Sequence, residues 1–194
     1  SCGAAVTLRH RSVTLAVCEF CQQTMHIHRD GVDPTGKTAP LTDFAAVLAL
    51  NARGTLGGRG FSTAGRLRFD YDDGYWDEWF LLFDDGEESW LVEDEGELTL
   101  ARKVRAEGEV PAFEELRVGQ RATVGGIALV VTERGTATVA GGEGQLPMVV
   151  RPGGVVRYVD GNAGGETVMV EYTEDGVEVS QGKPIDHDDI DVEF

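Results

Sequence analysis

The sequence predicts a mostly β protein, with a short zinc-ribbon-like segment followed by two similar small antiparallel β-barrels, SH3-like or related. Three observations lead to this prediction. Glycine is frequent, with 26 residues in a chain of 194, and it lies in short clusters between runs rich in Val, Leu and Phe. A Cys-x-x-Cys pair lies near the N-terminus. Part of the sequence also matches itself at an offset of 68 positions.

Charge and hydrophobicity exclude several classes of function. The formal net charge is −17, whereas nucleic-acid binding depends on Lys and Arg that neutralise phosphates, so we expect no nucleic-acid partner. No apolar run approaches the roughly 18 residues of a transmembrane helix, and no signal peptide is present. We therefore expect no direct membrane insertion and a cytoplasmic location. The charge favours basic proteins, polyamines and metal cations as partners, or it simply keeps a bacterial protein dispersed.

Residues 1–29 are the predicted zinc-ribbon-like segment. Cys18 and Cys21 form a Cys-x-x-Cys pair, and Cys2 precedes Cys18 by 16 positions. Alternating apolar residues around them suit short strands, and thiolates presented on tight turns hold zinc in a tetrahedron. Cys2, Cys18 and Cys21 are therefore the predicted ligands of one structural zinc ion.

The fourth zinc ligand has several candidates. They are His10, His26, His28 and a cysteine two positions before Ser1, because ribbons usually open on Cys-x-x-Cys-Gly and this chain does not open on Met. Buried free thiols are an alternative to the zinc site. A redox pair would need a βαβ pattern, which is missing, and a disulfide would need an exported chain.

Residues 30–52 are a predicted linker with a short helix. They contain Gly31, then four residues, then Gly36-Lys37-Thr38, which is the letter pattern of a phosphate-binding loop. Such a loop needs a buried strand before it and a helix after it. The preceding MHIHRD is short and polar, and Pro40 would cost the following helix a hydrogen bond. We therefore expect no nucleotide site here.

The self-match predicts two copies of one β unit. Arg53-Gly-Thr-Leu-Gly-Gly58 aligns with Arg121-Ala-Thr-Val-Gly-Gly126, and apolar and polar residues alternate in Phe61–Tyr71 as in a half-buried strand. Asp-Gly turns, which favour tight hairpins, recur in both copies. The predicted boundaries are 53–108 for the first barrel, 109–120 for a connection, 121–185 for the second barrel and 186–194 for an acidic tail.

The acidic tail contains one further candidate for a metal site. His187 lies among Asp186, Asp188 and Asp189, which could hold a divalent cation weakly. A solvated tail explains these residues more simply.

The segment YWDEWFLLFDDG, residues 75–86, is the candidate binding element. Trp76, Glu78 and Trp79, with Trp90 after the next turn, place a carboxylate among indole rings, where it can hold a cationic ligand. Alternate residues of a strand face opposite ways, so both faces of this strand carry large apolar side chains. The other interpretation is core packing together with an interface between the two barrels.

The same segment carries a resemblance to a known family. Trp76–Gly86, followed by Trp90-Leu91, resembles the W-N-E-W-Y-L-x-F-D-D-G…W-L run of the bacterial domain of unknown function 4178, with Asp77 where Asn is more usual. The runs Gly57–Arg66 and Gly141–Pro147 also resemble that family, as does a ribbon ahead of the barrel. Its members often lie in gene neighbourhoods with polyamine-synthesis-like enzymes and small membrane proteins. The resemblance implies a stress-linked accessory role and does not supply a reaction.

These observations predict a non-enzymatic binding or adaptor module of the bacterial cytoplasm. The expected partner is a protein or a cationic small molecule, and no pattern indicates an oligomeric state. The alternative is an enzyme or small-ligand binder that acts on polyamine-like cations. A catalytic site needs convergent polar groups in an apolar pocket, and the sequence supplies no Ser-His-Asp or Cys-His set to which we can assign catalysis.

Overall fold

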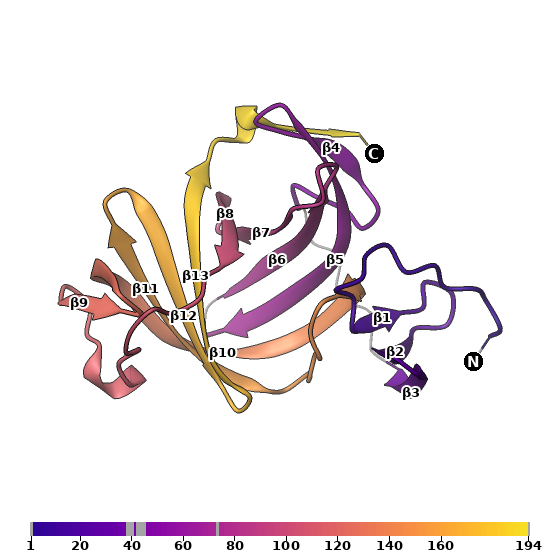
Figure 1. Cartoon of the computed structure of the whole chain (residues 1–194), viewed down its shortest axis with the longest axis horizontal. Helices are drawn as coiled ribbons and strands as arrows, with labels where there is room; N and C mark the ends of the chain where they lie inside the picture. Colours follow the sequence, from indigo (N-terminus) through magenta and orange to yellow (C-terminus); the bar gives the residue numbers. More distant parts are fainter. Residues whose placement is uncertain (1, 38–40, 42–45, 73, 194) are drawn as a thin grey trace.

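The computed structural model of the chain describes residues 2–37, 41, 46–72 and 74–193. Within these residues the chain forms fourteen β-strands and two short 3-10 helices, and it contains no α-helix. The prediction of a mostly β fold is confirmed. The strands form a small N-terminal sheet and a larger barrel, which lie side by side in Figure 1.

Three short strands form the N-terminal sheet: β1 (Leu15–Val17), β2 (Gln23–His28) and β3 (Gly31–Lys37). Each is antiparallel to the next. β1 also pairs with a barrel strand, with Leu15 opposite Leu146, so the sheet is attached to the barrel through main-chain hydrogen bonds.

β3 lies where we predicted the start of a linker, and its pairing with β2 differs from the strand–loop–helix arrangement of a nucleotide-binding loop. Residues 46–52 contain no helix. Residues 38–40 and 42–45, which include Thr38 and the rest of the predicted short helix, lie outside the described residues.

Eight antiparallel strands close the barrel. Their order is β5-β6-β7-β8-β13-β12-β11-β10, and β10 returns to pair with β5. Three further strands extend the sheet: β14 pairs with β4, β4 with β5, and β9 with β10. The bounds are β4 (Arg53–Leu56), β5 (Arg59–Tyr71), β6 (Gly74–Phe83), β7 (Glu88–Asp94), β8 (Glu97–Lys103), β9 (Arg121–Val124), β10 (Ile127–Leu146), β11 (Val155–Ala163), β12 (Glu166–Thr173), β13 (Gly176–Ile185) and β14 (Ile190–Glu193).

The two barrels that we predicted are instead the two halves of one barrel. Residues 53–108 supply β5 to β8 and residues 121–185 supply β10 to β13, and the halves join where β5 pairs with β10 and β8 pairs with β13. Each half alone would leave two edge strands with unpaired backbone groups, and closure satisfies both edges. The period-two pattern located the strands but carried no information on which edges meet.

Alternation along each strand sorts the side chains between the interior and the outside of the barrel. In β12, Met169 and Glu171 face the interior, whereas Val168 and Val170 face outward. The outward residues of β11 to β13 pack against the segment that contains η1 (Phe113–Glu115) and β9. The outer face of these strands is therefore buried, which explains why the barrel needs the connecting segment.

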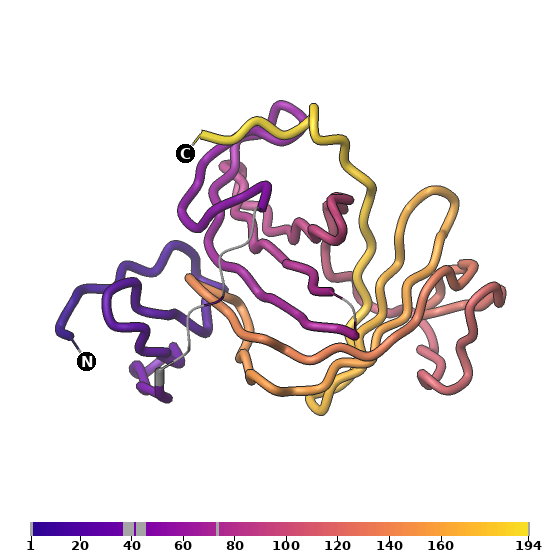
Figure 2. The backbone as a smooth tube through the Cα atoms, turned by 180° about the vertical axis from the view of Figure 1, so that it is seen from behind, coloured from indigo at the N-terminus to yellow at the C-terminus, as the bar shows by residue number. Residues whose placement is uncertain are grey.

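The predicted acidic tail is an ordered part of the sheet over its described residues. After the short η2 (His187–Asp189), β14 runs antiparallel to β4, with Ile190 opposite Leu56. Figure 2 shows this yellow segment running beside β4. Trp79, Leu81 and Leu91 form part of an apolar cluster on the outer face of β6 and β7, called the outer cluster below. Ile190 and Val192 pack against it, so the alternating apolar residues of the tail form a strand. Among the described residues, His187 belongs to no group of metal-binding side chains; its Nε2 lies 2.8 Å from the carbonyl oxygen of Gly96.

Candidate functional site

The barrel encloses a cavity of about 430 Å³, a size in the range of small-molecule sites. One wall is apolar and aromatic, with Phe69 from β5, Trp76 from β6, Trp90 from β7 and Val139 from β10. Side chains from β11, β12 and β13 form the opposite wall, which carries most of the acidic groups. Carboxylates also lie on the aromatic side, where β6 supplies Glu78 and β7 supplies Asp94, so the cavity offers a ligand an aromatic wall with acidic groups on both sides.

Carboxylates far outnumber cationic side chains around this cavity. Among the described residues, eight carboxylates face two cations: Glu78, Asp94, Glu133, Asp160, Glu171, Glu174, Asp175 and Glu178 against Lys103 and Arg151. Lys103 forms an ion pair with Glu178, and Arg151 with Asp175 at the rim. Both cations are exposed, and within the described part of the chain no cation forms an ion pair with Glu78, Asp160 or Glu171.

Strand register places four of these carboxylates as directly opposed pairs. Glu133 of β10 is opposite Asp160 of β11, and Glu171 of β12 is opposite Glu178 of β13. Residues opposed in this way project from the same face of the sheet, and like charges in such pairs destabilise it. Two like-charge pairs on the inner face of one barrel indicate a site that a cation can neutralise.

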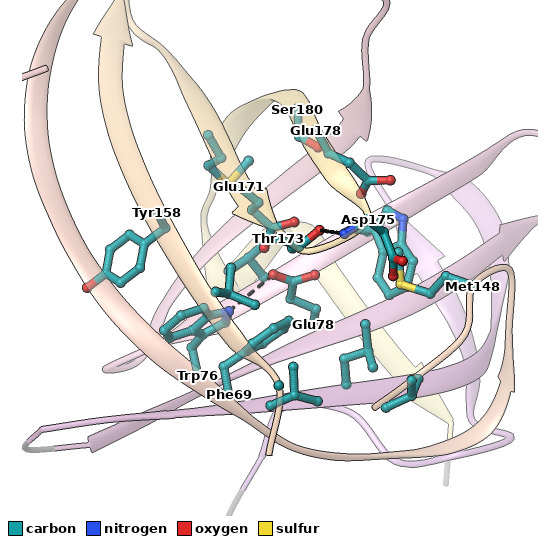
Figure 3. A pocket seen from close by; sticks show the side chains of 18 of the residues that line it. Phe69, Trp76, Glu78, Met148, Tyr158, Glu171, Thr173, Asp175, Glu178 and Ser180 are labelled. Carbon is teal, nitrogen blue, oxygen red and sulfur yellow. Dashed lines mark hydrogen bonds between the residues drawn. The ribbon is translucent and has the colours of Figure 1, made fainter. Parts of the chain in front are cut away.

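Trp76 is the centre of the aromatic wall. Its ring stacks on Phe69 at 4.8 Å and meets Tyr158 edge-to-face at 5.2 Å and Tyr71 at 5.8 Å between ring centroids. Its indole Nε1 donates a hydrogen bond of 3.1 Å to Glu78. Figure 3 shows the Glu78 carboxylate beside Trp76, with Glu171 projecting into the same space.

Burial raises the pKa of four cavity carboxyl groups, those of Glu78, Asp94, Asp160 and Glu171. Desolvation is the main cause for each. Protein atoms surround the carboxyl group, and the side chain is only half-buried because it faces the cavity. It raises the pKa of Asp160 to about 8, and the charges of Glu133, Glu171 and Asp94 add to the effect. Desolvation also raises the pKa of Glu171, to which Glu78 adds, and the pKa of Glu78, which its hydrogen bond from Trp76 and the charge of Lys103 partly oppose. The empty site thus favours protonated carboxyl groups, which a bound cation would ionise.

The structure brings together three of the four predicted binding residues. Trp76, Glu78 and Trp90 line the cavity. Trp79 does not line the cavity, because its side chain points outward from the barrel. There it is buried in the outer cluster, with 1% of its surface exposed, and its indole donates a 3.0 Å hydrogen bond to Glu93. For Trp79 the structure therefore supports core packing rather than ligand binding.

Asp77 is also turned away from the cavity. Its carboxylate accepts hydrogen bonds of 2.8 and 2.6 Å from Arg68, in a pair that is almost fully buried. Arg66 lies 3.8 Å from Asp77 and forms a 2.7 Å ion pair with Glu143. These contacts form a buried ionic network on the outer face, so Asp77 is already neutralised.

Sequence reasoning missed Asp160, Glu171 and Glu133. A signal for one of them was present, since Val168, Val170 and Tyr172 alternate with Met169 and Glu171 in β12. That pattern gives two faces, but only closure of the barrel makes the Glu171 face an interior.

The three predicted metal ligands converge. The sulfur atoms of Cys2, Cys18 and Cys21 all lie within 4.8 Å of one another, so they could hold a metal ion. None of the three histidines proposed as a fourth ligand joins this group among the described residues. Instead, the Nδ1 atom of His10 lies 2.5 Å from Glu88 of the barrel.

The sequence comparisons agree with the barrel boundaries. The family model described as "Domain of unknown function (DUF4178)" matches residues 49–187, which include all eight strands of the barrel. The chain belongs to this family. No curated protein and no solved structure matches the chain of this DUF4178 member. Its described residues contain no helix with the length and hydrophobicity of a membrane span.

Proposed function

We propose that this DUF4178 protein is a non-enzymatic binding module whose barrel cavity takes a small organic cation. One observation carries the proposal, which is the convergence of Glu78, Glu171 and Asp160 beside the ring of Trp76 in one cavity. Carboxylates attract an ammonium group, and an aromatic face adds a cation–π contribution of about 2 kcal/mol when the cation is desolvated.

The cost of burying carboxylates supports a cation rather than a neutral ligand. A buried, unpaired charge is expensive, and a fold that needs none replaces it with an apolar residue. An ammonium group beside Glu78 and Glu171 would ionise both, and it would relieve the repulsion between Glu171 and the opposed Glu178. Polyamine-like molecules fit this chemistry, because each ammonium group is joined to methylene groups that the apolar wall can cover.

The alternative function is an enzyme that acts on such a cation. Carboxyl groups whose pKa lies near neutrality can serve as general acid or base, and burial raises the pKa of Asp160 to about 8. Recovery of the amine unchanged in mass after long incubation favours the binding module. Formation of a new product that requires Asp160 favours the enzyme.

We propose zinc as the ion of the cysteine cluster. With Zn–S bonds of about 2.3 Å, two sulfurs of a tetrahedral site lie about 3.8 Å apart, and the sulfurs of Cys2 and Cys18 are 3.8 Å apart. Cys21 has a pKa lowered to about 7 by hydrogen bonds from the backbone of Gln23 and Cys2, which suits a thiolate ligand. Zinc here would have a structural role next to β1.

The family resemblance adds a cellular setting to the proposal. We propose that the module works in the bacterial cytoplasm, as an accessory to a polyamine-linked or membrane-stress-linked system, and that a protein partner is the alternative to a cationic small molecule. The two halves of the barrel, β4 to β8 and β9 to β13, follow the same order of a short strand, a Gly-Gly turn and four longer strands. We propose that they are two copies of one unit, as the 68-residue match in Arg53–Gly58 and Arg121–Gly126 indicates.

The test of the proposed function is a titration with spermidine at about 150 mM salt, where surface attraction is largely screened. Trp76 and Trp90 line the cavity, so tryptophan fluorescence reports on it. We expect saturable binding that weakens about tenfold in Glu78→Gln, which corresponds to about 1.4 kcal/mol. Asp191→Asn, which removes an exposed charge on β14, is the control and should bind normally. Equal binding by both variants, or none by the wild-type protein, would overturn the proposal.

A further inference from the structure

Asp160 is a cavity residue whose carboxyl group has no partner among the described residues of the barrel. Among the described residues its carboxyl forms no hydrogen bond and no ion pair, although the side chain is half-buried and faces the cavity. It is directly opposite Glu133, at a Cβ separation of about 4.5–5.5 Å. Glu133 is exposed and Asp160 is half-buried, and two acidic side chains this close disfavour the empty site.

The other opposed pair differs in one respect. Glu171 and Glu178 are also directly opposite each other, but Lys103 forms an ion pair with Glu178. At the Glu133–Asp160 pair, Tyr158 donates a 2.8 Å hydrogen bond to Glu133. Among the described residues, a cation of the chain therefore forms an ion pair at one acidic pair and not at the other.

Two hydroxyl groups and an indole ring frame the uncompensated pair. Besides the Tyr158 contact with Glu133, Tyr71 donates a 3.3 Å hydrogen bond to Asp94, which adds a third carboxylate. The rings of Tyr71 and Tyr158 both contact Trp76. Aromatic rings around carboxylates form a surrounding that suits an ammonium group and the methylene group attached to it.

Register also gives the spacing between this pair and Glu171, which lies near Glu78 in the same cavity. Asp160 is opposite Met169, and Glu171 lies two residues further along β12 on the same face. Such diagonal neighbours are about 7–8 Å apart. Trp76 lies between the two acidic groups, because it contacts Tyr158 on one side and donates to Glu78 on the other.

We propose that Glu133, Asp160 and Asp94 form a second cation subsite, and that the cavity binds a linear diamine with one ammonium group in each subsite. The inference rests on the proposed function, because it assumes that the Glu78–Glu171 subsite holds the first ammonium group. The diagonal spacing matches the two ends of a short alkyl chain, and the rings of Trp76 and Tyr158 cover the methylene groups between them.

The test compares two amines that differ only in the second charge: 1,5-diaminopentane and n-pentylamine. Their binding is measured by calorimetry at about 150 mM salt. We expect the wild-type protein to bind the diamine at least tenfold more tightly. Asp160→Asn keeps the shape of the side chain and should remove this preference, because it weakens the binding of the diamine much more than the binding of n-pentylamine. Asp191→Asn is the matched surface control.

The outcomes separate the two proposals. If neither amine binds the folded wild-type protein, the proposed function fails, and the second subsite fails with it. If both amines bind with equal affinity, the second subsite is refuted and the proposed function stands. A diamine preference that survives in Asp160→Asn also refutes the subsite. Glu171→Gln should weaken both amines alike, because both use the first subsite.

Discussion

Replacing Asp160 with Asn should stabilise the empty protein, and the gain should grow with pH. The unfolded chain ionises this carboxyl near pH 4, whereas the folded protein holds its proton up to about pH 8 because burial disfavours the charge. The wild-type protein therefore loses stability from this group as the pH rises from about 4 to about 8. Asn never ionises, so the variant does not undergo this loss.

The magnitude follows from the pKa shift. A rise from 3.8 to about 8 sets a ceiling of about 5–6 kcal/mol, at about 1.36 kcal/mol for each pKa unit. Water reaches the cavity and screens part of the charge, so an effective gain of about 2–3 kcal/mol above pH 8 is expected. Below about pH 3 the carboxyl is protonated in both states, so the difference between the variant and the wild-type protein should vanish there and still be small at pH 4.5.

Urea unfolding at pH 4.5, 7 and 9 measures this difference directly. The slope of free energy against urea concentration should be the same in both proteins, since the fold is unchanged. Asp191→Asn, an exposed change of the same charge, should show no growing difference. An Asp160→Asn variant that is less stable than the wild-type protein at pH 9, or equally stable at every pH, would refute the assignment of Asp160 as a buried, uncompensated carboxyl.

Four other outcomes are expected. Trp79→Ala should lower the free energy of unfolding by about 3–5 kcal/mol in urea, because this ring is buried in the outer cluster; a loss under 1 kcal/mol would contradict that burial. Arg68→Ala should cost about 3–5 kcal/mol, since it leaves Asp77 buried without its partner, and a neutral effect would argue against the ion pair. Cys18→Ser should lose bound zinc in elemental analysis while the barrel keeps its β circular dichroism; unchanged zinc would remove the cluster as its site. Lys37→Ala should leave the melting temperature unchanged, and saturable ATP binding abolished by this variant would reverse our interpretation of Gly31–Lys37 as a strand.

The sequence predicted the strands better than their partners. Alternation in residues 75–86 puts Trp76 and Glu78 on one face and Trp79 on the other, because the side-chain period of a strand is two whatever the fold around it, yet we had predicted all three as one binding site. It does not tell which face is the cavity, since Trp79 and Leu81 are as apolar as Trp76 and Phe80. That choice depends on Leu48 and β14, which come from distant segments and cover the outer face.

The acidic side of the cavity depends even more on long-range contacts. Asp160 and Glu171 follow Glu78 by more than 80 positions, and they meet it only because β8 pairs with β13 and β5 with β10. Local patterns contain no signal for these two pairings. The cysteine cluster is the opposite case, since tight turns and a short separation in sequence bring Cys18 and Cys21 together, and the spacing alone predicted it.

The most direct test of a cation site inside the barrel is the proton balance of amine binding. Calorimetry at pH 7 in two buffers with different ionisation enthalpies gives the number of protons released when 1,5-diaminopentane binds. Asp160, with a pKa near 8, is largely protonated at this pH, so the amine must displace protons from the cavity. We predict a release of about one proton or more, reduced in Asp160→Asn. Binding without proton release would place the amine on exposed carboxylates and contradict the cavity as its site.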